Sequence, residues 1–77
     1  GLASENRSLQ DKINQAALTT EAQNRERQRI LAELDQVRRE MAQAGAVTDP
    51  REKQKELERL KEKQARLARE VEELTRL

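Results

Sequence analysis

The side chains best suited to chemistry in this chain are carboxylates and cations, because its 77 residues include no cysteine and no histidine. Adjacent carboxylates such as Glu72 and Glu73 could in principle exchange protons with a substrate. Acid–base catalysis also needs a cleft and a desolvated, oriented partner group, which a rod of helices does not provide. We therefore expect no enzymatic activity, no catalytic residue and no cofactor.

The sequence also lacks the residue patterns of common metal and nucleotide sites. Zinc sites are built mainly from cysteine and histidine, and this chain contains neither. No glycine-rich stretch of the GxxxxGK[ST] or GxGxxG type is present to bind phosphate groups. The sequence thus predicts no metal site and no small-molecule ligand.

The basic residues suggest a different kind of chemistry, the binding of nucleic acid. Arg25, Arg27 and Arg29 alternate along the chain, and residues 51–69 include eight basic and four acidic side chains. The net charge is only +1, however, and no aromatic residue is available to stack on a base. A basic helical hairpin that binds RNA or DNA is therefore an alternative that we rank below a structural role.

The composition indicates long helices rather than a globular core. Charged residues make up 40% of the chain and hydrophobic residues 34%, and aromatic residues are absent. An excess of alanine, glutamate, lysine, leucine and arginine is typical of coiled coils. No apolar run approaches the ~20 residues that cross a bilayer, and no secretory signal is recognisable. We expect no membrane insertion and an intracellular, cytoplasmic location.

Apolar residues repeat with coiled-coil spacing from residue 2 to residue 44. The strongest stretch has spacings of four, three, four and three, and it consists of Ile30, Leu34, Val37, Met41 and Ala44. The same phase extends back to the beginning of the chain, where one seam position is occupied in turn by Leu2, Leu9, Ala16, Gln23, Ile30, Val37 and Ala44. This unbroken phase predicts one continuous helix over residues 2–44.

A break near Thr19 is the alternative for this helix. Thr20, Gln23 and Arg27 are consecutive polar residues of the seam, and threonine is a poor helix former. Thr20 and Gln23 also have the spacing of a capping box, in which each side chain bonds the backbone of the other residue. We prefer the continuous helix because the heptad phase does not shift here, and we expect the polar stretch to be a weak point of the assembly.

Residues 45–49 predict a turn between two helices. Gly45 suits a helix end that needs a positive φ. Asp49 suits the N-cap of a second helix, and Pro50 suits its first position. Glu52 could complete a second capping box by accepting a bond from the Asp49 N–H.

The second helix, predicted over residues 50–77, has an apolar seam in a different phase from the first. A short connection makes two helices antiparallel neighbours, so the predicted fold is all-α, a two-helix antiparallel coiled-coil hairpin. Two registers fit: one pairs Leu34 with Leu60, and the other, slipped by one heptad, pairs Leu34 with Leu67. The predicted hairpin seam consists of Ile30, Leu34, Val37, Met41, Leu57, Leu60, Leu67, Val71 and Leu74.

The first helix is too long for the second to cover, so its beginning is predicted to be an N-terminal helical overhang. Exposed apolar seams usually mark interfaces, and Asn6 at a seam position could pair with its equivalent in a parallel dimer. The predicted intermolecular interface consists of Leu2, Asn6, Leu9, Ile13 and Ala16.

These features together suggest a non-catalytic oligomerisation or scaffolding segment of a larger protein, for example a cytoskeletal one. We expect protein–protein interaction through the apolar seams. The expected partner is a second copy of the chain, in a homo-oligomer for which a dimer is favoured, or another helical protein segment. An autoinhibitory coiled coil is a further alternative.

Overall fold

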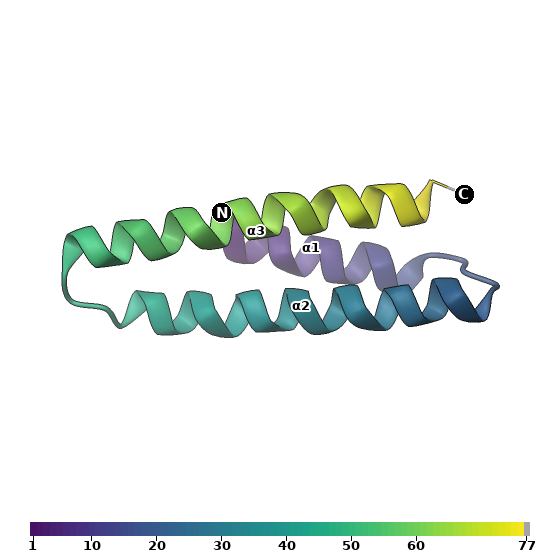
Figure 1. Ribbon diagram of the computed structural model, residues 1–77, viewed down its shortest axis with the longest axis horizontal. Coiled ribbons are helices and arrows are strands. Elements are labelled where there is room, and N and C mark those ends of the chain that lie inside the picture. The colour runs from purple at the N-terminus through teal and green to yellow at the C-terminus, as the bar shows by residue number, and fades with distance from the viewer. Residues whose placement is uncertain (77) are drawn as a thin grey trace.

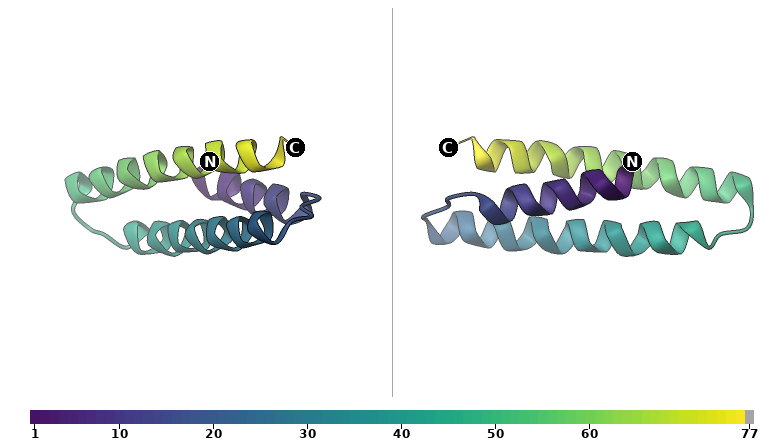
Figure 2. Two further views of the ribbon diagram at one scale, coloured as in Figure 1. Left: turned by 45° about the vertical axis from the view of Figure 1, so that its right-hand side comes forward. Right: turned by 180° about the vertical axis from the view of Figure 1, so that it is seen from behind.

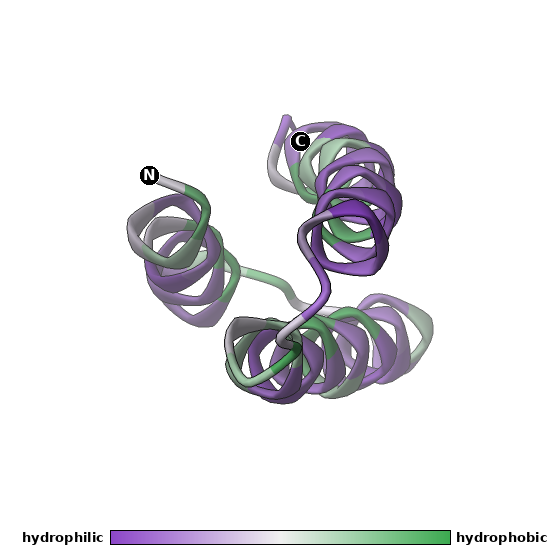
Figure 3. Ribbon diagram, turned by 90° about the vertical axis from the view of Figure 1, so that its left-hand side faces the viewer, coloured by the Kyte–Doolittle hydropathy of each residue, from purple (hydrophilic) through white to green (hydrophobic). Residues whose placement is uncertain are grey.

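Three helices packed side by side form the structure, a computed structural model that describes residues 1–76 (Figure 1). The helices are α1 (Leu2–Gln15), α2 (Glu21–Gly45) and α3 (Pro50–Thr75). The chain reverses direction after α1 and again after α2, so α1 and α3 are parallel to each other and antiparallel to α2 (Figures 1 and 2). Each helix contacts the other two, and the end view places them at the corners of a triangle (Figure 3). The resulting bundle measures 46 × 17 × 16 Å.

The predicted two-helix hairpin with an N-terminal overhang is wrong, because the chain makes two reversals instead of one. The helix predicted over residues 2–44 is interrupted at residues 16–20, where Ala16 has an extended backbone (φ −64°, ψ 134°). As a result α1 folds back along α2 and α3, and the protein is a three-helix bundle. The second predicted helix corresponds to α3, and Leu77, its predicted last residue, lies outside the described residues.

The break between α1 and α2 is held by polar side chains of Thr20 and of the first turns of α2. The Thr20 hydroxyl accepts a bond from the Gln23 N–H at 3.0 Å, and Gln23 Oε1 accepts from the Thr20 N–H at 3.2 Å. This capping box confirms the alternative that the sequence offered. The Arg27 guanidinium donates to the carbonyls of Ala16 at 2.7 Å and Asn14 at 3.2 Å. These are the last carbonyls of α1, which lack partners within the helix.

The core lies along the axis between the helices, and its apolar part consists of aliphatic residues. Eight apolar residues are fully buried there: Ile13, Ile30, Leu34, Val37, Ala44, Leu60, Leu67 and Val71. Six more hydrophobic residues are half-buried against this cluster: Leu2, Leu9, Leu31, Met41, Leu57 and Leu74. Ile13 is the only fully buried apolar side chain that α1 contributes within the described residues, so α1 is the least firmly anchored helix.

The contacts of Asn6 relate the level of α2 to that of α3. The Asn6 side chain bonds the Leu34 carbonyl and the Gln64 side chain at the same time, which places these two residues near one level of the bundle. In the sequence Gln64 lies between Leu60 and Leu67, the two residues that the predicted registers pair with Leu34. The sequence could not distinguish these alternatives because α1, which contacts both helices, was absent from the predicted hairpin.

The connection from α2 to α3 spans residues 46–49. The Asp49 carboxylate accepts a bond from the Arg51 N–H at 2.9 Å, and Pro50 occupies the first turn of α3. The second capping box does not form, since the bonds that cap α3 include none from the Asp49 N–H to Glu52. The start of α3 is thus stabilised by the aspartate and the proline alone.

Gly45 is the last residue of α2 and does not have a positive φ, so the conformation expected for it is wrong. Ala46, the next residue, is also in the right-handed helical region (φ −89°, ψ −7°), and its N–H bonds the Gln43 carbonyl at 3.1 Å. A Cβ atom on Gly45 would meet no other atom within 4 Å. Neither the backbone nor the surroundings of Gly45 therefore require glycine.

We expect the substitution Gly45→Ala to stabilise the bundle. Alanine loses less backbone entropy than glycine on folding, which is worth about 0.5–1 kcal/mol in a helix. In a domain of this size, 1 kcal/mol shifts Tm by about 4–8 °C, a change that thermal unfolding followed by far-ultraviolet circular dichroism resolves. Ala46→Gly is the matched control and should lower Tm. A lower Tm for Gly45→Ala would show that this residue needs a positive φ after all.

Candidate functional site

A buried polar layer crosses the bundle and joins all three helices. Asn6 in α1 and Gln64 in α3 are 1% and 0% exposed. The Asn6 Nδ2 donates to Gln64 Oε1 at 2.8 Å and to the Leu34 carbonyl at 2.9 Å. The Gln64 Nε2 donates to the Leu2 carbonyl, and Gln10 Nε2 donates to Asn6 Oδ1, both at 2.9 Å. Both buried amides thus have partners for their nitrogen and oxygen atoms.

This layer sets the position of α1 along the hairpin. A buried amide without partners is costly, and the partners of Asn6 come from α2 and α3 together. A slide of α1 in either direction would separate these groups, so the bonds favour one alignment. Polar residues at seam positions have this role in coiled coils. The structure places Asn6 in contact with other helices of its own chain, where the sequence suggested its equivalent in a second copy.

The five residues predicted to form the intermolecular interface all lie in α1 or at its end. Ile13 is fully buried in the core of the same chain, like Asn6. Leu2 and Leu9 are half-buried against the core, and Ala16 is half-buried at the break. α2 and α3 therefore cover part of this stripe within one molecule, and Leu2, Leu9 and Ala16 stay partly accessible.

The residues predicted for the hairpin seam do gather between α2 and α3, but at two levels of burial. The fully buried ones are Ile30, Leu34, Val37, Leu60, Leu67 and Val71. Met41, Leu57 and Leu74 are only half-buried. Met41 and Leu57 lie beyond the part of the hairpin that α1 covers.

Within residues 1–76, one end of the bundle consists of α2 and α3 alone, and α1 begins beside the middle of α3 (Figures 1 and 2). We call residues 41–61 the uncovered end. A groove runs here between the start of α1 and the first half of α3, and its lining residues are Gly1, Leu2, Glu5, Gln54, Leu57, Glu58 and Lys61. Leu2 and Leu57 form its apolar part, and both remain partly accessible.

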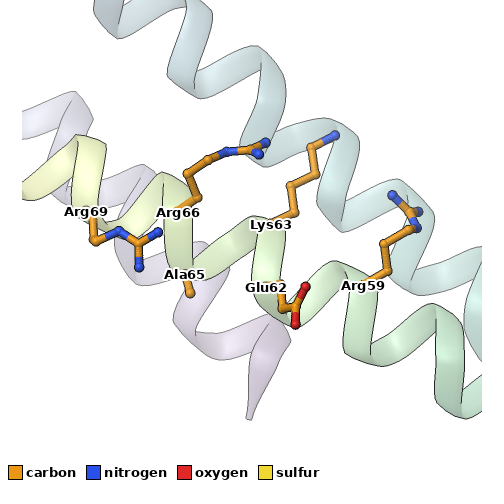
Figure 4. A pocket seen from close by; sticks show the side chains of 6 residues that line it. All are labelled: Arg59, Glu62, Lys63, Ala65, Arg66 and Arg69. Carbon is orange, nitrogen blue, oxygen red and sulfur yellow. The ribbon is translucent and has the colours of Figure 1, made fainter.

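A second feature is a shallow groove on α3 in which positive charge collects (Figure 4). It is lined by Arg59, Glu62, Lys63, Ala65, Arg66 and Arg69. We call its four cationic residues the basic surface. No ion pair within residues 1–76 involves Lys63, Arg66 or Arg69. Arg66 and Arg69 are exposed and Lys63 is half-buried, and Glu62 is the only acidic residue in the groove lining.

Arg59 differs from the other members of the basic surface because it is already paired. Its guanidinium bonds Glu56 on the same helix and Glu40 on α2, the latter at 2.7 Å. The bond to Glu56, and then that to Glu40, raise the pKa of Arg59 above its ordinary value. The same contact lowers the pKa of Glu56. Arg59 therefore links α2 to α3 and is less available to an anionic ligand than its neighbours.

Exposed ion pairs also join α3 to the other two helices further along the bundle. Lys12 of α1 lies 2.7 Å from Glu72, and its hydrogen bond lowers the pKa of that carboxyl group. Arg29 of α2 lies 2.8 Å from Glu70. Because about half of the Lys12 and Glu72 side chains remains exposed, such a pair adds little to stability. Its main effect is on the alignment of α1 with α3.

The described residues offer little for other kinds of site. Within residues 1–76, no group of three or more acidic, cysteine or histidine side chains is placed to hold a metal ion. No helix in this part of the chain is long and apolar enough to span a membrane.

Leu2 and Leu57 are recognisable in the sequence as seam residues, but the sequence does not predict that they line one groove. The polar groove residues Glu5, Gln54, Glu58 and Lys61 carry no periodic signal, since their importance depends on where α1 begins relative to α3. Asn6 and Gln64 were recognisable as polar residues at seam positions. That shared property is the signal from which their contact could have been suspected.

Comparisons of the chain with protein families, with curated proteins and with solved structures gave no match in any of the three. A functional assignment therefore depends on the surfaces described above.

The polar layer leads to a test by a double-mutant cycle. Asn6→Leu and Gln64→Leu should each reduce the free energy of unfolding by about 1–3 kcal/mol, because each leaves a buried polar group without its partner. The double variant replaces both groups with apolar ones, so its loss should be smaller than the sum of the single losses, with a coupling of about 1 kcal/mol or more. Urea unfolding measures all four proteins. Strictly additive losses would mean that the two amides do not interact.

Proposed function

We propose that this protein is a non-catalytic helical module that binds a helical segment of another chain at its uncovered end. The observation that carries this proposal is the groove beside the start of α1, where Leu2 and Leu57 stay partly accessible. Along the rest of the hairpin, α1 itself fills the equivalent position between α2 and α3. An amphipathic helix is therefore the natural occupant of the groove, with its apolar side chains against Leu57.

A second copy of the chain is the partner that we favour. The rim of the groove carries charges of both signs, with Glu5 and Glu58 on one hand and Lys61 on the other. In a dimer with twofold symmetry, Lys61 of one copy can face a glutamate of the other, so the same surface is complementary to itself. Because the uncovered end is short, we expect weak association that depends on concentration. Such a contact would suit a scaffolding segment of a larger, intracellular protein.

Sedimentation equilibrium tests this assignment with Leu57→Gln. The polar side chain removes the apolar part of the groove but stays on the half-buried surface of α3, so we expect a folded protein whose dimerisation is weakened about tenfold or more. Lys55→Gln is the matched control: it introduces the same residue at an exposed position of the same helix outside the groove, and it should dimerise like the original chain. Equal dimerisation of both variants, or a monomer at all concentrations up to the millimolar range, would rule out self-association through this groove.

Binding of nucleic acid is the second candidate, and the basic surface supports it. Lys63, Arg66 and Arg69 present three cations on one side of α3 without ion-pair partners in the described chain. Such a surface can contact a phosphate backbone. The chain has a net charge of only +1 and lacks the aromatic residues that hold single strands by stacking. We therefore rank this function second.

Fluorescence anisotropy with labelled RNA and DNA at low salt separates the two candidates. If the basic surface binds phosphates, the double variant Lys63→Gln/Arg66→Gln should lose most of the affinity and show a shallower dependence on salt, by roughly one unit of slope for each lost contact. Arg38→Gln/Arg39→Gln changes the net charge equally on α2, where both arginines pair with Asp35, and should have a small effect. The absence of binding at low salt would dismiss this function.

A further inference from the structure

The contacts that hold α1 in place do not involve the connection that joins it to α2. Asn6 bonds Leu34 and Gln64, and Lys12 pairs with Glu72. All of these partners lie within α2 and α3. An identical α1 from a second molecule would therefore find the same surface and make the same contacts.

The connection itself, residues 16–20, is held mainly by caps at its two ends. The capping box of Thr20 and Gln23 satisfies the start of α2, and the Arg27 guanidinium satisfies the end of α1. In a helical connection the same backbone groups would bond one another along the helix. Opening the break therefore exchanges one set of bonds for another and leaves few groups without partners. Only Ala16 and Leu18 of this segment are even half-buried.

The heptad phase is continuous across the break. Two helices joined by a chain reversal do not need to share a heptad phase. Leu2, Leu9 and Ala16 occupy one seam position, and the same seven-residue count leads on to Ile30 and Val37 in α2. When the connection is straightened, the core faces of α1 and α2 consequently lie on the same side. The extended α1 can then reach the free position on a second molecule without twisting.

We propose that α1 is exchanged between two copies of the chain by opening of residues 16–20. The exchanged dimer joins two bundles end to end, at the end where α2 begins and α3 stops. Each half keeps the three-helix packing described above, but its α1 comes from the other copy. Domain exchange of this kind needs no new interface, because the contacts of α1 are those already present in the monomer. The proposal concerns a different surface from the uncovered end and does not depend on it.

Chemical cross-linking between two single-cysteine chains tests the exchange. The chain has no cysteine of its own, so one copy can carry Lys12→Cys and a second, tagged copy Glu72→Cys. In the original chain these two side chains lie 2.7 Å apart. When the two proteins are incubated together at high concentration and treated with a short bis-maleimide, exchange places the two cysteines side by side on different chains. We expect a covalent heterodimer whose yield rises with concentration.

A control pair measures cross-linking by random collision. A copy with Lys55→Cys replaces the copy with Glu72→Cys, since residue 55 lies at the uncovered end, far from position 12 of α1 in both arrangements. The pair at positions 12 and 72 should give at least ten times the yield of this control. Equal yields would overturn the proposal. A dimer formed through the uncovered end does not bring positions 12 and 72 of two copies together, so the failure of exchange and the failure of the proposed function are distinguishable.

The substitution Ala17→Pro should favour the closed form, in which residues 16–20 reverse the chain and α1 packs on its own α2 and α3. Ala16 has the extended conformation that a residue before proline prefers. The Leu18 N–H bonds the Ala16 carbonyl at 3.0 Å, a three-residue turn whose central φ is close to that of proline. The Ala17 N–H has no backbone partner in the described chain. Proline therefore fits the closed connection, but within a straight helix it removes a backbone bond and clashes with the preceding turn.

Introduced into both single-cysteine chains, Ala17→Pro should leave the circular dichroism spectrum of the bundle unchanged. The yield of the covalent heterodimer should fall to that of the collision control, because proline disfavours a helical connection about a hundredfold or more. An unchanged yield in a folded proline variant would overturn the proposal that a helical connection carries the exchange. Should the proline variant fail to fold, the comparison of the 12/72 pair with its collision control decides alone.

Discussion

The chain reversal at residues 16–20 is the constraint on which the remaining structure depends. A helix that stops leaves carbonyl groups at its end without partners, and the helix that follows leaves N–H groups at its start in the same condition. The stop is tolerated here because Thr20 and Gln23 bond the start of α2, while Arg27 bonds the end of α1. The reversal brings α1 back along the hairpin. It thereby covers within one molecule a stripe that a straight helix would expose.

Burial of apolar groups alone does not fix the position of α1 within the bundle. Only Ile13 of its apolar side chains is fully buried, and contacts between aliphatic side chains discriminate weakly between neighbouring registers. Asn6 adds the discrimination, because its bonds to Gln64 and to the Leu34 carbonyl exist in one alignment only. A shift of one heptad would bury the same amides without partners, at about 1–3 kcal/mol for each group. The layer therefore contributes specificity more than net stability.

Local patterns predicted the parts of the fold that local energetics decide. The pair Asp49 and Pro50 identified the start of α3 to the residue, because an N-cap and a first-turn proline act within one turn of helix. The region around Thr20 was different, since two local patterns compete there. The continuous heptad phase favours a straight helix, and the capping box favours a stop. The docking of α1 on residues up to 62 positions away decides between them, and no local pattern contains that energy.

The candidate site shows the same limit. Leu57 was predictable as an apolar seam residue, but its place in a groove beside Leu2 follows from the docking of α1, which the contact between Asn6 and Gln64 aligns. The hydrophobic pattern therefore predicted which residues lie on apolar seams, but not which of them are fully buried. The basic surface was predictable from the excess of positive charge over residues 51–69. The ion pair between Arg59 and Glu40 was not, because it depends on how α2 packs against α3.

The stability of α1 as a helix bears on its exchange between copies. α1 has 14 residues, whereas α2 and α3 have 25 and 26. A helix of 14 residues is marginal by itself in water, so α1 owes its stability to the surface on which it docks. An undocked α1 regains helical structure most easily as a continuation of α2, because extending an existing helix avoids the unfavourable nucleation step. The surface of α2 and α3 on which α1 docks therefore stabilises this helix, whichever copy of the chain supplies it.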